Sequence, residues 1–181
     1  CSTILIKNQF YISIVTSLAI MKTLKHFSVQ KLNIKWPNDI LSENKKICGI
    51  LIENVIKNNK LQASIIGIGL NVNQTNFKDL PKASSLKIIT GTVFNLDELL
   101  SHILKNLKYY FAYLEKREFN KLKKEYESLL FKKDKPATFT DSYGEMFSGF
   151  IKGISRTGKL QVELEDAVLK EFDLKEVKLL Y

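Results

Sequence analysis

The chain reads KWPND at Lys35–Asp39, KICGILIE at Lys46–Glu53 and GIGLN at Gly67–Asn71. Pro37 fixes its own backbone and favours extended geometry at Trp36, which predicts that a strand ends here in a defined turn. The second segment predicts a buried strand that opens with a lysine, and the third predicts a strand end marked by two glycines. The three segments together span 37 residues. Their order predicts one site built from a turn and two neighbouring strands.

Apolar periodicity predicts the elements around these segments. Apolar residues recur every three or four positions from Phe10 to Leu24 and from Leu99 to Leu114, which predicts two helices. Asn95 followed by Glu98 resembles a capping box at a helix start, and a further helix is predicted over 118–130. Between the first two helices, hairpins are predicted over residues 40–56 and 46–68, with turns at 42–45 and 57–60.

The apolar period changes from helical to two beyond Lys132–Pro136, the best predicted domain boundary in the chain. Short strands are predicted at residues 137–140, 145–154, 159–165, 168–173 and 177–180. Strands this short and this numerous predict a small closed β-barrel. The sequence therefore predicts an α+β protein with one domain at residues 1–133 and a second at residues 137–181.

The composition is that of a globular protein, with 45% hydrophobic and 26% charged residues among 181. The net charge of +9 is unevenly distributed: residues 137–181 hold six basic and eight acidic residues, net −2, which leaves +11 for residues 1–136. A solvated helix face explains such a bias, and so does attraction for a nucleotide phosphate, an acidic protein or a nucleic acid. Charge alone leaves the partner open.

Two features bear on the compartment. The segment Phe10–Met21 holds 12 mostly apolar residues, too few to span a bilayer, and its pattern continues at helical spacing, which predicts a buried core helix. Cys1 and Cys48 have no spacing typical of a zinc site or a disulfide framework, so a reducing, cytoplasmic setting is predicted, with Cys48 as a buried free thiol. Because the first residue is not Met, the chain is expected to be a fragment or to begin after the start of its gene.

The ordered set of KWPND, KICGILIE and GIGLN resembles the catalytic core of the biotin protein ligases, which make biotinyl-5′-adenylate and load biotin onto a carrier lysine. The resemblance covers nearly all of the chain in pattern, but its specific motifs lie between Lys35 and Asn71. It implies a mixed β-sheet with packed helices, followed by a C-terminal SH3-like barrel. It also implies ATP and Mg²⁺ as cofactors, biotin as substrate, and the biotin carrier domain of a carboxylase as partner.

The resemblance also implies a role for each site residue. Lys46 is the implied catalytic residue, in contact with both the biotin acid and the α-phosphate. The implied biotin-binding residues are Lys46, Gly49, Leu51, Gly67 and Gly69, and the implied ATP-binding residues are Asn38, Asp39, Lys46 and Asn71. Asp39 is also the implied metal-binding residue, because Mg²⁺ favours a few carboxylate oxygens alongside phosphate. Structural roles stay open beside these: an exposed turn lysine, a bulge at the glycines, and ordinary turn residues at 38–39.

The chemistry suits this set of residues. The chain has only two histidines and no nucleophile-elbow motif. Adenylate formation needs no protein nucleophile, because the carboxylate of the substrate attacks the α-phosphate while the enzyme holds two anions together. A positioned lysine and a closely approaching backbone are what this reaction requires.

One feature of the family is missing from the chain. In the family, a glycine- and arginine-rich loop upstream of these motifs folds over the adenylate, and no Gly-Arg-Gly run occurs here. The chain alone is therefore expected to bind biotin and ATP weakly and to be catalytically impaired. A helix-turn-helix domain is absent as well, so the repressor activity of some relatives gains no support.

Two alternatives stay open beside a biotin ligase. A lipoate or octanoate protein ligase or transferase of the same superfamily is the nearer one, although the KWPND motif and the small barrel favour biotin. A nucleic-acid-binding module is the other, but the barrel is net acidic, and the spacing of Phe147 and Phe150 puts them on opposite strand faces. We predict no membrane and no nucleic acid as partner, and a homodimer as a further expectation.

Overall fold

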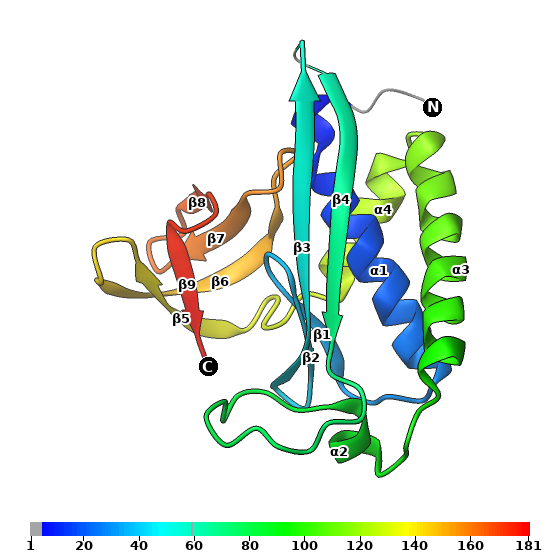
Figure 1. The fold of residues 1–181 in the computed structure, drawn as a ribbon. Helices are drawn as coiled ribbons and strands as arrows, with labels where there is room; N and C mark the ends of the chain where they lie inside the picture. Colours follow the sequence, from blue (N-terminus) through cyan, green and yellow to red (C-terminus); the bar gives the residue numbers. More distant parts are fainter. Residues whose placement is uncertain (1–4, 59) are drawn as a thin grey trace.

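The computed structural model describes residues 5–58 and 60–181, so the predictions for Cys1 and for Asn59 in a hairpin turn lie outside the described residues. The fold class is α+β, as predicted (Figure 1). The first part of the chain forms η1 (Ile6–Asn8), α1 (Phe10–His26), β1 (Leu32–Lys35), β2 (Asp39–Ser42), β3 (Lys45–Lys57), β4 (Lys60–Leu70), α2 (Leu86–Thr90), α3 (Leu96–Glu115) and α4 (Phe119–Ser128). The last part forms β5 (Pro136–Asp141), β6 (Met146–Ile154), β7 (Leu160–Leu164), β8 (Leu169–Phe172) and β9 (Val177–Leu180).

Strands β1 to β4 form one sheet in sequence order, and every neighbouring pair is antiparallel. The prediction of a mixed sheet is wrong for these strands. Among the described residues, parallel pairing is confined to isolated bridges, at Ile34–Leu130, Lys46–Ala83 and Lys133–Ile151. The reason is the shortness of the turns between the strands, since parallel neighbours need a crossover connection of a dozen or more residues.

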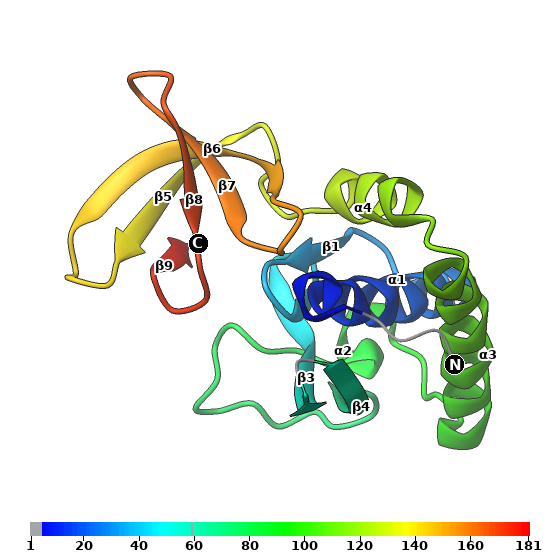
Figure 2. The same ribbon diagram turned by 90° about the horizontal axis from the view of Figure 1, so that it is seen from above.

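The sheet has one covered and one open face. In β3, Cys48 and Ile50 are buried, whereas Leu51 is 64% exposed and Val55 is 50% exposed. This alternation places Cys48, Ile50 and Ile52 on the core side of the sheet, and Figure 2 shows α1 lying between the sheet and α3. The opposite face of the β3–β4 hairpin is left open.

Helix α1 is the centre of the core, as its apolar pattern predicted. Ile14 and Val15 have no exposed surface, and Leu18 is 1% exposed. Where α3 begins, the Asn95 side chain accepts hydrogen bonds from the backbone N–H groups of Asp97 and Glu98, which confirms the predicted helix start. In the part of the chain that the structure describes, no helix is both long and apolar enough to cross a membrane.

Strands β5 to β9 form a second antiparallel sheet in the order β8-β7-β6-β5-β9. The ends of all five strands agree with the predicted ones to within one residue. The Phe147 ring of β6 stacks on Phe139 of β5 at 5.3 Å and on Phe172 of β8 at 5.4 Å. Because β6 and β8 are separated by β7, this stacking indicates a strongly curved sheet, which fits the predicted small SH3-like barrel.

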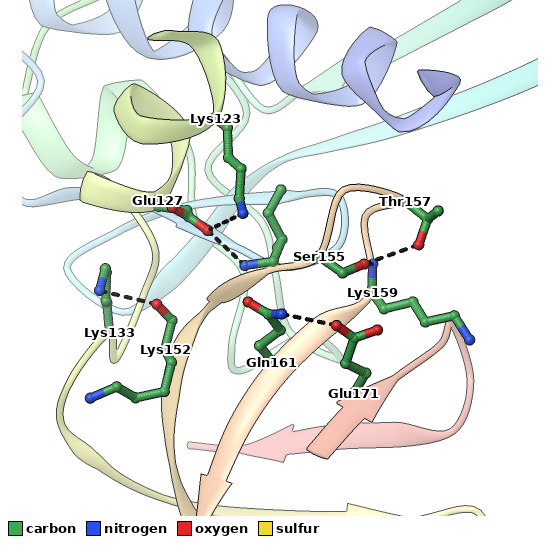
Figure 3. A network of polar contacts seen from close by, with 10 residues as sticks. Lys123, Glu127, Lys133, Lys152, Ser155, Thr157, Lys159, Gln161 and Glu171 are labelled. Atoms are coloured by element: carbon green, nitrogen blue, oxygen red, sulfur yellow. Dashed lines mark hydrogen bonds and ion pairs between the residues drawn. The ribbon is translucent and has the colours of Figure 1, made fainter. Parts of the chain in front are cut away.

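Helix α4 connects the two sheets. The Glu127 carboxylate accepts a hydrogen bond of 2.8 Å from the backbone N–H of Ile154 in β6 and lies 3.6 Å from the ammonium group of Lys123 (Figure 3). An ideal Cβ on Gly153 would lie 2.2 Å from the same carboxylate, so a larger residue here would push the Glu127 side chain away from β6. The second sheet is therefore held against α4 by a specific polar contact.

Cys48 is a free thiol, 1% exposed, and its burial raises its pKa to about 12. In a Cys1→Ser background, we expect iodoacetamide to alkylate Cys48 in the folded protein at pH 8 at least about a thousandfold more slowly than in the urea-unfolded protein, because the thiolate is the reactive form. Mass spectrometry of timed samples measures this difference. Equal rates in the two states would contradict the buried position.

Candidate active site

Three residues form a row across the open face of the first sheet. Asp39 of β2 lies directly opposite Gly49 of β3, and Gly49 lies directly opposite Gly69 of β4. An ideal Cβ on Gly69 would lie 3.7 Å from the Gly49 carbonyl oxygen, so the two backbones approach closely without side chains above them. The backbone of Gly49 and Gly69, here called the glycine floor, is therefore not covered by side chains of its own. The Asp39 carboxylate lies at one end of the row.

Lys46 lies over this row because the strand is irregular. In a regular strand, residues three apart face opposite sides of the sheet, so Lys46 and Gly49 would point away from each other. The pairing of β2 with β3 shifts register between Ile40 and Leu41, and both Ile47 and Cys48 are buried. The bulge reverses the alternation. An ideal Cβ on Gly49 would accordingly lie 3.3 Å from the Lys46 ammonium nitrogen.

The backbone of Lys46 is held by the segment that follows β4. Its N–H donates to the carbonyl of Lys82 at 2.7 Å, and its carbonyl accepts from the N–H of Ser84 at 2.9 Å. Leu41 of β2 lies opposite Lys46 on the other side. The backbone of Lys46 is therefore held between β2 on one side and the segment after β4 on the other.

Leu51 and Gly67 form the next pair along the hairpin. They lie directly opposite each other, two residues from Gly49 and Gly69. Leu51 is 64% exposed, and Ile65 beyond it on β4 is 62% exposed. An apolar strip thus continues from the glycine floor on the open face, as a site for an aliphatic ligand requires.

Asp39 forms ion pairs with two lysines. Its Oδ1 lies 2.6 Å from Lys46 Nζ and its Oδ2 lies 3.7 Å from Lys35 Nζ. Burial lowers the pKa of Lys35, the nearby Lys46 lowers it further, and Asp39 opposes both effects. The positive charge of this cluster exceeds its negative charge, so it suits an anionic ligand.

The pKa of Lys35 leads to a test of stability against pH. Because the folded-state pKa is lowered, holding Lys35 charged destabilises the fold at pH 7, and this cost disappears as the pH rises through the unfolded-state pKa of about 10.4. Lys35→Met should therefore raise the free energy of unfolding relative to wild type more at pH 7 than at pH 10. Urea unfolding at both pH values measures this, and a difference that grows with pH would contradict it.

The two asparagines of the motifs are bonded within the protein. The Asn38 amide donates to the Ile50 carbonyl at 2.8 Å, and the Ile50 N–H donates back to the Asn38 carbonyl. The Asn71 amide donates to the Ser84 carbonyl at 3.0 Å and accepts from Gln74. Both residues thus fix the loops that border the row, and their predicted contacts with ATP stay predictions.

Three residues at the site were missed or left unassigned. Lys35 opens the KWPND motif but was assigned no role. Its position four residues before Asp39 is the sequence feature that could have indicated the ion pair between them. The Tyr181 ring lies 5.1 Å from the Lys35 ammonium and 4.6 Å from that of Lys82. Neither Tyr181 nor Lys82 stands in a motif, so only the fold brings them to the site.

The predicted metal role of Asp39 depends on one carboxylate. Residues 5–58 and 60–181 hold no group of three or more His, Cys, Asp or Glu side chains that could bind a metal by themselves. Mg²⁺ is commonly bound by one or two carboxylates together with substrate phosphates, so a single Asp39 fits that demand. Its role as a ligand stays a prediction.

Comparison with known proteins shows what the whole chain is similar to. Residues 3–71 match the family described as "Biotin/lipoate A/B protein ligase family". Biotin protein ligase from Aquifex aeolicus, in a structure with biotin and ATP, aligns at a TM-score of 0.79 and 26% identity, covering 98% of this chain and 75% of that one. The chain is therefore similar to the biotin/lipoate protein ligases over residues 3–71, and to this solved ligase over nearly its whole length.

Two curated proteins extend the comparison. "Bifunctional ligase/repressor BirA" of Bacillus subtilis is 35% identical over 97 residues, which cover 51% of this chain and 30% of the relative. The protein of the same description from Escherichia coli is 24% identical over 161 residues, which cover 88% of this chain and 50% of the relative. The chain thus spans half or less of these relatives.

Proposed function

We propose that this chain carries the catalytic core of a biotin protein ligase, which activates biotin with ATP and transfers biotin to a lysine of a carrier protein. The observation that carries the proposal is the row Asp39–Gly49–Gly69 with the Lys46 ammonium group above it. Support comes from the ligase of Aquifex aeolicus, which shares the fold and has been solved with biotin and ATP.

The residues of the row suit the first half-reaction. The carboxylate of biotin attacks the α-phosphorus of ATP, a C–O–P linkage forms, and pyrophosphate leaves. Lys46 is placed to neutralise both the carboxylate and the α-phosphate, while the bare backbone at Gly49 and Gly69 allows close approach. Asp39 orients Lys46 through the 2.6 Å contact, and Mg²⁺ with the bound nucleotide would supply further positive charge beside Asp39.

The second half-reaction requires access for a macromolecule. The carrier lysine attacks the carbonyl carbon of the mixed anhydride, an amide forms, and AMP leaves. The open face of the β3–β4 hairpin, with Leu51 64% exposed, offers such access. We propose the biotin carrier domain of a carboxylase as the partner that presents this lysine.

The choice of biotin over lipoate or octanoate is part of the proposal. Support comes from the KWPND motif, the C-terminal five-stranded sheet and the likeness to a solved biotin protein ligase. We further propose residues 1–133 as the catalytic domain, residues 137–181 as a separate SH3-like barrel, and a cytoplasmic location. The homodimer and the absence of nucleic-acid binding stay predictions.

The experiment that tests the function is transfer of biotin to a carrier domain. The complete gene product is incubated with ATP, Mg²⁺ and a purified biotin carrier domain, with biotin, lipoate or octanoate as the acid, and the carrier is weighed by mass spectrometry. The proposal expects a mass increase with biotin alone, lost when the carrier lysine is changed to arginine. Modification with lipoate or octanoate in place of biotin would favour the superfamily alternative.

A further inference from the structure

Trp36, inside the KWPND motif, makes a hydrogen bond to the C-terminal part of the chain. Its indole Nε1 donates to the carbonyl of Gly158 at 2.9 Å, across 122 positions of sequence. Both residues are buried, and Trp36 is 9% exposed. Removing the donor would leave a buried carbonyl without its partner, which makes this contact costly to break.

The position of Gly158 is fixed independently of Trp36. Its φ of +93° belongs to the left-handed region, and an ideal Cβ there would lie 2.1 Å from the Phe10 ring. Phe10, at the start of α1, therefore packs directly on this turn. The turn between β6 and β7 is thus a rigid reference point that the Trp36 indole reaches.

Apolar packing between the KWPND turn and the second sheet is incomplete. A cavity of about 200 Å³ lies between Lys35–Pro37 and β6, β7 and β9, lined by Ile151, Leu160, Val177 and Leu179 together with Lys178. Side chains around a cavity constrain one another less than close-packed ones do. The directional hydrogen bond to Gly158 therefore matters more for the placement of the turn.

Trp36 is directly connected to the charged groups of the site. Lys35 precedes it and lies 3.7 Å from Asp39, and Asp39 lies 2.6 Å from Lys46. On the far side of the turn, Asn38 is paired with Ile50. A shift of the indole would therefore displace Lys35 and change its contact with Asp39, while the pairing of Asn38 with Ile50 and of Asp39 with Gly49 holds.

We infer that Trp36 is a positioning residue: through its indole, the turn at Gly158 fixes the KWPND turn and with it the Lys35–Asp39–Lys46 cluster that receives the phosphates of ATP. The inference rests on the proposed function. It assigns a specific route by which the C-terminal sheet acts on the nucleotide end of the site and leaves the biotin end, at Gly67 and Leu51, unaffected.

The test compares Trp36→Phe, which keeps an aromatic ring but removes the N–H donor, with a matched control. Glu127→Ala removes another polar contact between the first part of the chain and β6, namely the bond to Ile154, and touches no residue of the site (Figure 3). Both variants are made in the complete gene product. Urea unfolding gives their stability, and biotin-dependent pyrophosphate release gives KM for ATP, KM for biotin and kcat.

The two variants are expected to lose stability to a similar extent and to differ in kinetics. Trp36→Phe should raise KM for ATP about tenfold and leave KM for biotin within about twofold of wild type. Glu127→Ala should leave both constants near wild type. An unchanged KM for ATP in Trp36→Phe, or an equal rise in Glu127→Ala, would overturn the inference. Absence of biotin-dependent pyrophosphate release by the wild type would instead refute the proposed function.

Discussion

Replacing Lys46 by alanine is expected to slow adenylate formation by about 10²- to 10³-fold, the usual effect of losing one group that stabilises developing charge. The Lys46 ammonium lies above Gly49 and beside Asp39, where the α-phosphate and the acid would meet. Its side chain is 44% exposed, so its loss should change the free energy of unfolding little. Pyrophosphate release under saturating biotin and ATP measures the rate.

The neighbouring Lys45→Ala is the matched control for this prediction. Lys45 is an exposed lysine at the start of the same strand, and its ammonium group contacts the Pro81 carbonyl away from the glycine row. Its removal should leave the rate within about twofold of wild type, as for most surface substitutions. Equal rates for the two variants would mean that Lys46 has no special role.

Replacing Gly69 by valine is expected to raise KM for biotin by about a hundredfold, because a ligand held 1 Å out of place loses that much. An ideal Cβ at Gly69 meets the Gly49 carbonyl at 3.7 Å, an ordinary contact, so the added side chain would stand on the open face above the row. Valine is also well suited to a strand, so folding should be retained.

Ala63→Val provides the control for Gly69→Val. Ala63 lies on the same strand and pairs with Val55, six residues from Gly69 along β4. It adds bulk to the exposed side of the hairpin at a distance from Lys46, so KM for biotin should stay near the wild-type value. A similar rise in KM for biotin in both variants would show that added bulk anywhere on the hairpin weakens the use of biotin. That result would contradict a specific role for the glycine floor.

The strands and helices were predictable because their periods are distinct. The five strands after Lys132–Pro136 were placed to within one residue, and the α3 start at Asn95 follows from its capping side chain. The mixed sheet was predicted wrongly, because that detail came from a resemblance, whereas the turn lengths in the chain favour antiparallel pairing.

The structure brings the predicted residues Asp39, Lys46, Gly49 and Gly69 together, but their geometry could not be read from the sequence. The spacing of Lys46 and Gly49 marked both residues, but a regular strand would have separated them, and nothing in the sequence announces the bulge that buries Ile47. Tyr181 and Lys82 come to the Lys35 end of the site through long-range packing. Such contacts depend on the relative position of whole elements, which local pattern does not encode.

The most direct measurement of the central claim is formation of the adenylate itself. The complete gene product is incubated with biotin and ATP labelled at the α-phosphate, and the protein-bound products are separated by chromatography. We predict a labelled biotinyl-5′-adenylate that requires biotin and is lost in Lys46→Ala but kept in Lys45→Ala. Absence of labelled adenylate with the wild type, or its undiminished formation by Lys46→Ala, would contradict the account.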